Sequence, residues 1–247
     1  MRVYLGWFYP ELMSTYGDRG NIIALSYWAK ILGIDLKIVK ISLSQPKEIV
    51  VKMDLLFMGG AQDKQQEIVN QDLKNNKGEY LKKSIENGTF GLFVCGGYQF
   101  LGHYYKTADG TKIPGLSIFD IYTENPGSAF PRLIGDIGIK TRIARSEIVV
   151  GFENHGGRTY LVDKNLAFGK VVFGFGNNGL DKTEGIFYKN TIGTYLHGPI
   201  LPKNPFLTRF FLEKVIEKKY KKKIKPKKFD EEWERKAREK VIKERLK

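Results

Sequence analysis

Cysteine is nearly absent from this sequence: Cys95 is the only one in 247 residues. A single cysteine excludes an intrachain disulfide and disfavours a structural zinc site, so we expect a reducing, cytoplasmic compartment. Long apolar runs are absent too, and the first residues read as a β-strand and not as a signal peptide. The sequence therefore predicts a protein without a membrane span, long enough for one large domain.

Acidic residues are scarce beside basic ones, with 27 Asp and Glu against 41 Lys and Arg. Residues 213–247 alone hold 16 basic and 8 acidic side chains, more than half of the formal net charge of +14. We predict one domain over residues 1–222 and a charged C-terminal extension over 223–247, a solvated helix that docks on the domain or on a partner through Phe229 and Trp233. Binding of nucleic acid or of an anionic membrane surface by this tail is the alternative.

Apolar runs alternate with helical patterns through the first hundred residues. Strands are predicted at Val3–Phe8, Leu36–Ile41, Leu55–Met58 and Gly91–Val94, and helices at Asn21–Leu32 and Gln65–Asn87. This alternation predicts an α/β fold, a doubly wound and mostly parallel sheet flanked by helices. Asp18 is the expected N-cap of the first helix and Gly33 its C-terminal stop.

The second half of the sequence has a different pattern of residues. Short strands separated by Gly, Asn and Pro are predicted at Leu116–Tyr122, Ile134–Thr141, Ile148–Phe152, Thr159–Val162, Lys170–Phe175, Gly185–Tyr188 and Thr191–Leu196, followed by a helix at Pro205–Tyr220. We expect these strands to form an antiparallel or mixed extension of the first sheet.

Cys95 is the candidate nucleophile because it stands where an apolar strand meets a glycine pair and a helix. A helix N-terminus favours the thiolate over the thiol, and the strand-to-helix turn lifts a side chain to the open edge of a parallel sheet. The alternative is a buried structural cysteine. Gly96, and Gly60 at the end of the strand Leu55–Met58, are the candidate oxyanion hole, because both allow backbone N–H groups to approach a reacting carbonyl.

Three histidines could serve as the general base. His103 is predicted on the helix that follows Cys95, about 12 Å along its axis at 1.5 Å per residue, and so out of reach. His197 follows an apolar strand at the sheet edge where α/β proteins assemble their sites, and we favour it. His155 is expected on a glycine-rich loop as a structural or supporting residue.

Three separated motifs together resemble the class I glutamine amidotransferases in their cobyric-acid-synthase-like branch, whose fold is flavodoxin-like. They are Gly59-Gly60, Val94-Cys95-Gly96-Gly97-Tyr98-Gln99 and Gly193-Thr194-Tyr195-Leu196-His197-Gly198. Within the branch, Tyr16-Gly17-Asp18-Arg19-Gly20-Asn21 and Gly151-Phe152-Glu153-Asn154-His155 are similar to the glutaminase subunits that serve the amidation of lipid II. The resemblance implies that Cys95 attacks L-glutamine, that His197 moves the proton and that Arg132 holds the substrate.

Two residues depart from the family pattern. Pro199 stands where most class I members have the glutamate that orients the histidine, and Phe93 replaces a common glycine before the nucleophile. The resemblance implies that a partner subunit supplies the missing acid, and Asp18 or Glu153 of this chain is the alternative. No phosphate-binding loop is present. We therefore expect no cofactor here and the synthetase function on another chain. The resemblance implies that this partner is a Mur-ligase-like, ATP-dependent subunit, which holds ATP and metal and acts on lipid II in a heterodimer.

Other functions stay open at this point. The same glutaminase could serve amidation of a corrinoid or another cofactor, although those enzymes usually carry a fused ATP-using domain. A cysteine hydrolase of another kind could use the same fold, and an inactive scaffold could bind through the basic tail.

Overall fold

The central parallel sheet provides the frame for the site. The computed structural model describes residues 1–61, 63–143, 148–224 and 230–246. The sheet has strand order β13-β14-β4-β3-β1-β2, in which only β13 is antiparallel to its neighbour. Its strands are β1 (Arg2–Phe8), β2 (Asp35–Ile41), β3 (Leu55–Met58), β4 (Phe90–Val94), β13 (Ile186–Tyr188) and β14 (Thr191–Thr194). The predicted α/β class with a mostly parallel sheet is confirmed.

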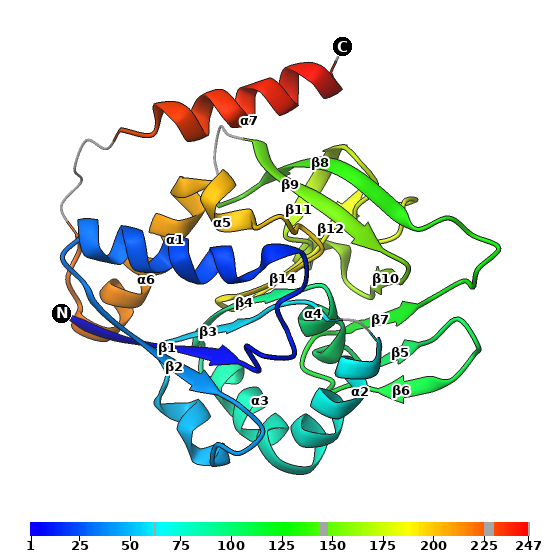
Figure 1. Cartoon of the computed structure of the whole chain (residues 1–247), viewed down its shortest axis with the longest axis horizontal. Helices are drawn as coiled ribbons and strands as arrows, with labels where there is room; N and C mark the ends of the chain where they lie inside the picture. The colour runs from blue at the N-terminus through cyan, green and yellow to red at the C-terminus, as the bar shows by residue number, and fades with distance from the viewer. Residues whose placement is uncertain (62, 144–147, 225–229, 247) are drawn as a thin grey trace.

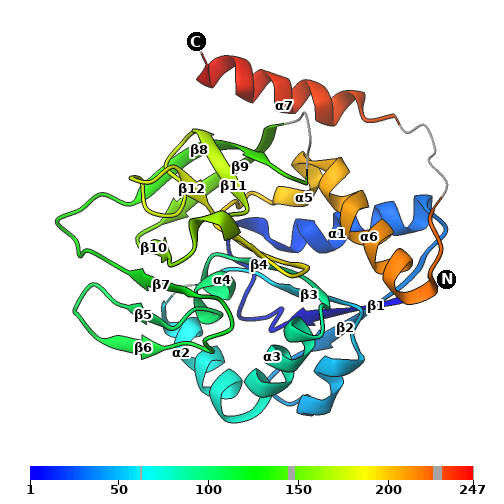
Figure 2. The same cartoon turned by 180° about the vertical axis from the view of Figure 1, so that it is seen from behind.

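The core lies on both faces of this sheet. Every residue of β3 and β4 is buried, as expected for central parallel strands covered on both sides. Helices α1, α5 and α6 lie on one face, and α2 and α3 lie on the other (Figures 1 and 2). Helix α1 turns a stripe with helical spacing, including Ile22, Leu25 and Ala29, into the core. Its predicted stop at Gly33 is confirmed, since Gly33 has a φ of +70°.

The helices follow the predicted pattern with one interruption. They are α1 (Arg19–Ile31), α2 (Asp63–Asp72), α3 (Gly78–Glu86), α4 (Gly96–Phe100), α5 (Ile200–Lys203), α6 (Pro205–Tyr220) and α7 (Glu232–Arg245). Short 3-10 turns occupy η1 (Thr15–Gly17), η2 (Lys47–Lys52) and η4 (Lys164–Leu166). The polar helix predicted at Gln65–Asn87 is divided by a π-helical turn, η3 (Leu73–Lys77).

The second half departs from the expected extension of the main sheet. Only β13 and β14 join that sheet, and the other strands form two four-stranded sheets. One contains β5 (Tyr104–Lys106), β6 (Lys112–Pro114), β7 (Ile121–Glu124) and β10 (Arg158–Leu161), and the other contains β8 (Leu133–Thr141), β9 (Ile148–His155), β11 (Gly169–Phe173) and β12 (Thr183–Glu184). Short connections such as those of β5–β6 and β8–β9 pair strands antiparallel, whereas parallel pairing needs a long crossover.

The C-terminal extension contains helix α7, which lies across α5, β8 and β9 (Figure 1). Two of its arginines contact the domain: Arg245 pairs with Asp136 at 2.8 Å, and the Arg238 guanidinium lies 5.2 Å from the centroid of the Phe206 ring. The Trp233 side chain, predicted to dock the tail, is 78% exposed. Phe229 lies outside the described residues.

Candidate active site

Cys95 occupies a strained turn between β4 and α4. Its φ of 52° and ψ of −109° lie in a region that residues with a side chain rarely adopt. The Cys95 N–H donates to the Thr194 carbonyl of β14 at 2.9 Å, which fixes the turn to the adjacent parallel strand. A strained residue at the apex of a strand–turn–helix unit is the geometry that presents a nucleophile at the open edge of a sheet.

The glycines after Cys95 permit a close approach to the end of β3. A Cβ on Gly97 would lie 2.9 Å from the Met58 carbonyl oxygen and 3.0 Å from that of Gly59. Helix α4 can therefore pack onto this edge only without a side chain there. The Gly96 N–H is the first of the helix, so it has no acceptor within the helix and is available to a ligand.

His197 converges on Cys95 from the neighbouring strand connection. A methyl group built on Gly60 would lie 3.0 Å from His197 Cε1 and 3.1 Å from Cys95 Cβ, so both side chains border the same small space. The His197 backbone pairs with Phe152 of β9 through two hydrogen bonds, of 2.7 and 3.1 Å. Strand β14 itself ends at Thr194, two residues earlier than predicted from the sequence.

Asp18 supplies a carboxylate to the other side of His197. Asp18 Oδ1 lies 3.4 Å from His197 Nδ1, and both side chains are fully buried. Asp18 stands at the N-cap position of α1, as predicted, but its side chain makes no capping hydrogen bond to the helix. Pro199 packs against α1 at Gly20, where a side chain on residue 20 would collide with the proline ring. The segment that follows His197 therefore lies against the helix that begins after Asp18.

The electrostatics of the pair favour a protonated imidazole. Burial lowers the pKa of His197, but the neighbouring Cys95 sulfur and the Asp18 carboxylate raise it by more, to about 10. With Nδ1 facing Asp18, Nε2 is the nitrogen left to serve Cys95. The arrangement of cysteine, histidine and carboxylate is that of a nucleophile activated by an oriented base.

The oxyanion hole needs one correction. The Gly60 N–H already donates to Asp18 Oδ2 at 2.8 Å, so it is not available to a substrate. The next backbone nitrogen, that of Ala61, lies 3.5 Å from the position of a Cβ on Gly96, and Ala61 lines the pocket. We therefore assign Ala61 and Gly96, rather than Gly60 and Gly96, as the proposed donors. Gly60 retains a different importance, since it leaves the room that Cys95 and His197 share.

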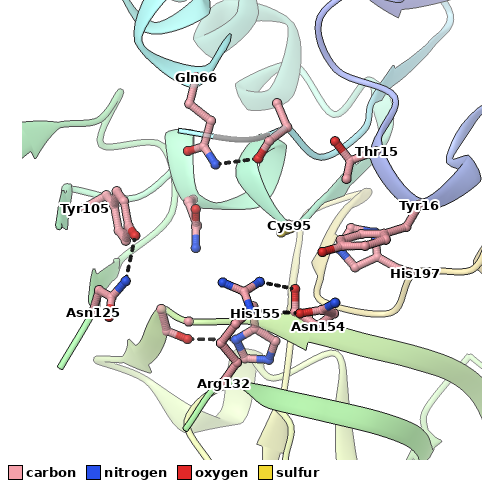
Figure 3. A pocket seen from close by; sticks show the side chains of 14 residues that line it. Thr15, Tyr16, Gln66, Cys95, Tyr105, Asn125, Arg132, Asn154, His155 and His197 are labelled. Atoms are coloured by element: carbon pink, nitrogen blue, oxygen red, sulfur yellow. Dashed lines mark hydrogen bonds between the residues drawn. The ribbon is translucent and has the colours of Figure 1, made fainter. Parts of the chain in front are cut away.

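A polar pocket of about 260 Å³ opens beside Cys95 and His197 (Figure 3). Its walls come from the turn after β1, from helices α2 and α4, and from the two smaller sheets and their connections. They include Thr15, Tyr16, Gln66, Gln99, Tyr105, Asn125, Arg132, Asn154 and His155. Hydroxyl, amide and guanidinium groups dominate, as suits a small polar ligand such as an amino acid.

Arg132 lies in this wall, where the sequence placed the substrate anchor. Its Nε donates to Asn154 Oδ1 at 2.9 Å and one terminal nitrogen donates to the Asn154 carbonyl at 3.0 Å. The two nitrogens on this edge of the guanidinium, Nε and Nη2, are therefore already used and cannot bind a substrate carboxylate through two parallel hydrogen bonds. The other terminal nitrogen, Nη1, is the one we propose for glutamine.

The other histidines are not catalytic candidates in this geometry. His155 ends β9 instead of lying on a loop; its Nδ1 is 2.7 Å from the Gly157 carbonyl, and its ring stacks on Tyr195 at 3.7 Å. Burial lowers its pKa, so the ring stays neutral. His103 follows the end of α4 at Phe100 and pairs with Asp120 at the surface. Glu153 accepts the N–H groups of Phe175 and Gly176 and so does not orient His197.

Sequence reasoning missed Tyr16, Ala61 and Asn154. Tyr16 and Ala61 adjoin glycines of the quoted motifs, and that adjacency was the available signal. Asn154 precedes His155 in the sequence, but its contact with Arg132 depends on the pairing of β8 and β9.

With this geometry established, comparison with known proteins identifies the family. A model of the CobB/CobQ-like glutamine amidotransferase domain matches residues 5–205. The chain belongs to this family. Solved glutamine amidotransferases share its fold: one, at 15% identity, has a TM-score of 0.58 over 85% of this chain and 98% of its own. The structure of PurLQS from Thermotoga maritima also shares the fold, with a TM-score of 0.55 at 16% identity, over 90% of this chain and all of its own.

Individual curated proteins give a more specific comparison than the family model. The chain is 46% identical over 235 residues to the lipid II isoglutaminyl synthase (glutamine-hydrolyzing) subunit GatD of Staphylococcus aureus (strain N315), covering 95% of this chain and 93% of that protein. It is 42% identical to the subunit of the same name from Streptococcus pneumoniae (strain R6), covering 86% and 80%. A probable cobyric acid synthase of Methanopyrus kandleri is 33% identical, but over 51% of this chain and 26% of that protein.

Proposed function

We propose that this chain is the glutaminase subunit of a lipid II isoglutaminyl synthase. It hydrolyses L-glutamine and delivers the ammonia to a Mur-ligase-like, ATP-dependent partner, which amidates the α-carboxylate of D-glutamate in lipid II during peptidoglycan synthesis. The observation that carries the proposal is the convergence of Cys95, His197 and Asp18 beside a polar pocket, in a chain whose relatives of that name match along most of their length.

The first half of the reaction uses the proton on His197. The Cys95 thiolate attacks the carbonyl carbon of the glutamine side-chain amide, and the N–H groups of Gly96 and Ala61 stabilise the negative charge that develops on the carbonyl oxygen. The C–N bond then breaks as His197 Nε2 donates its proton to the leaving nitrogen. Ammonia departs, and a glutamyl thioester remains on Cys95.

The second half regenerates the enzyme. His197, now neutral, removes a proton from a water molecule that attacks the thioester carbonyl, and Asp18 stabilises the imidazolium that forms again. The C–S bond breaks, and glutamate leaves while Cys95 returns to the thiolate. The sum is glutamine and water converted to glutamate and ammonia, for which the residues of this chain suffice.

Amidation of a carboxylate needs more than ammonia. The acceptor carboxylate must first be activated as an acyl phosphate, and we assign ATP, its metal ion and lipid II to the partner subunit of a cytoplasmic heterodimer. Within the described residues no helix could cross a bilayer. The corrinoid alternative is weaker, because the cobyric acid synthase relative matches this chain over only about a quarter of its own length.

Reconstitution tests the proposal. The chain, a Mur-ligase-like partner, ATP, lipid II and glutamine labelled with ¹⁵N in its side-chain amide should yield lipid II that carries one ¹⁵N in a new amide. Cys95→Ser should abolish this transfer, because a hydroxyl is a far weaker nucleophile than a thiolate, while added ammonium chloride restores amidation by the partner. Transfer of label that does not depend on Cys95, or no transfer by the wild-type complex, would contradict the proposal.

A further inference from the structure

The turn that leads from β1 to α1 has an unusual residue at its centre. In Thr15-Tyr16-Gly17-Asp18, Tyr16 has φ 55° and ψ 27°, Gly17 has φ 79°, and the Asp18 N–H donates to the Thr15 carbonyl at 3.3 Å. These values describe a type I′ turn, which needs a positive φ at both central residues and strongly prefers Asn, Asp or Gly there. An aromatic residue at the first central position adopts this conformation against its own preference.

The turn holds the Tyr16 ring against His197. The two ring centroids are 5.0 Å apart with an angle of 74° between the planes, the edge-to-face geometry of an attractive aromatic contact (Figure 3). His197 is fully buried, whereas Tyr16 is 46% exposed, so Tyr16 lies on the solvent side of His197. The Thr15 N–H fixes the turn by donating to the Gly60 carbonyl at 3.1 Å.

We propose that Tyr16 is a positioning residue of the glutaminase site, which holds the His197 imidazole between Asp18 and Cys95. The imidazole has Asp18 at Nδ1 and Cys95 on its other side, and the Tyr16 ring packs against it from a third direction beside the pocket. Strained backbone is retained where the surrounding structure fixes it for a function. This inference rests on the proposed function and deepens it by adding a residue that acts through His197.

Two variants separate the effect of the Tyr16 ring from the effect of the turn conformation. Tyr16→Asn places a residue that type I′ turns favour but removes the ring, whereas Tyr16→Phe keeps the ring and removes the hydroxyl. The matched control is Lys221→Asn, at an exposed left-handed residue (φ 55°) that ends α6. Lys221→Asn relieves the same kind of backbone strain without touching the pocket.

The measurements are the kcat and KM for ammonia release from glutamine in the presence of the partner, the Tm, and the NMR spectrum of the chain labelled with ¹⁵N-histidine. Because the chain has only three histidines, the proton on His197 Nδ1 can be assigned by a His197→Gln variant. In the wild type this buried proton, next to Asp18, should exchange slowly with water.

Tyr16→Asn should lower kcat about tenfold or more, leave KM within about threefold, broaden the His197 Nδ1 proton by exchange, and leave the Tm unchanged or higher. Tyr16→Phe and Lys221→Asn should retain the wild-type kcat and proton signal. The inference is overturned if Tyr16→Asn keeps both, or if Tyr16→Phe is as damaging as Tyr16→Asn, which would assign the effect to the hydroxyl. A wild-type chain without glutaminase activity would instead contradict the proposed function, and the NMR spectra would still decide the role of Tyr16.

Discussion

Replacing Asp18 by asparagine tests whether this chain carries its own orienting acid. The change keeps the size of the side chain and removes one negative charge from a fully buried position. Asp18 Oδ2 accepts the Gly60 N–H at 2.8 Å, and Oδ1 faces His197 Nδ1 at 3.4 Å. If the amide oxygen of Asn keeps the bond to Gly60, its NH₂ group faces Nδ1. The NH₂ group donates a hydrogen bond to Nδ1, so neutral His197 must carry its proton on Nε2. In this tautomer Nε2 cannot accept a proton from Cys95 or from water.

The magnitude follows from the distance. Two unit charges 3.4 Å apart attract by about 5 kcal/mol at an effective dielectric constant of about 20. The asparagine dipole recovers part of this attraction, and each 1.36 kcal/mol of lost transition-state stabilisation is a factor of about ten in rate. We therefore expect Asp18→Asn to lower kcat about 10²- to 10⁴-fold with little change in KM, because Asp18 acts through the imidazole and does not itself line the pocket.

The assay is ammonia release from glutamine at saturating concentration, with and without the partner. Glu153→Gln is the matched control. Glu153 is a buried carboxylate that accepts two backbone N–H groups, and its Oε2 lies 3.9 Å from His155 Nε2 rather than beside His197. It should cost stability but lower kcat less than tenfold. If Asp18→Asn in the assembled complex stays within about twofold of the wild type, Asp18 is not the orienting acid and the partner must supply it.

Three further predictions concern the pocket and its charge. Gly60→Ala should lower kcat about tenfold or more, because its methyl group would lie 3.0–3.1 Å from both His197 and Cys95; wild-type kcat would show that these side chains have room to move. Arg132→Lys should raise KM about tenfold with little change in kcat, and an unchanged KM would place the glutamine anchor elsewhere. The pKa of His197 rises on folding from 6.5 to about 10, so its stabilising interactions are complete below pH 6.5 and are lost as the pH rises through about 10. Urea unfolding should therefore show a steeper loss of stability between pH 6.5 and 10 in the wild type than in His197→Gln; equal slopes would contradict the raised pKa.

Much of the fold could be predicted because local sequence determines it. The buried strand Leu55–Met58 and helix Pro205–Tyr220 were predicted with their observed bounds, since apolar runs and proline mark them directly. The strand predicted at Leu116–Tyr122 was wrong, and pairing begins only at Ile121. Sheet membership in the second half was not predictable either, because short strands of similar composition can pair with several neighbours.

The site, like the fold, has features that local sequence predicts and features that it does not. The placement of Cys95 at a strand-to-helix turn was visible in the sequence, because an apolar run, a lone cysteine and two glycines are contiguous. The contact of Asp18 with His197 joins residues 179 positions apart, and the loss of Gly60 as an oxyanion donor follows from the bond to the same carboxylate. Such contacts depend on how strands and helices pack, which no local pattern specifies.

The most direct test of the central claim is the covalent intermediate on Cys95. The chain, mixed with glutamine and its partner and quenched in acid within milliseconds, should show a mass increase of one glutamyl group that maps to the peptide containing Cys95. The increase should be absent in Cys95→Ser, and it should accumulate in Asp18→Asn if hydrolysis of the thioester is slowed more than its formation. Ammonia release by the wild type without any adduct on Cys95, or undiminished ammonia release by Cys95→Ser, would contradict the account.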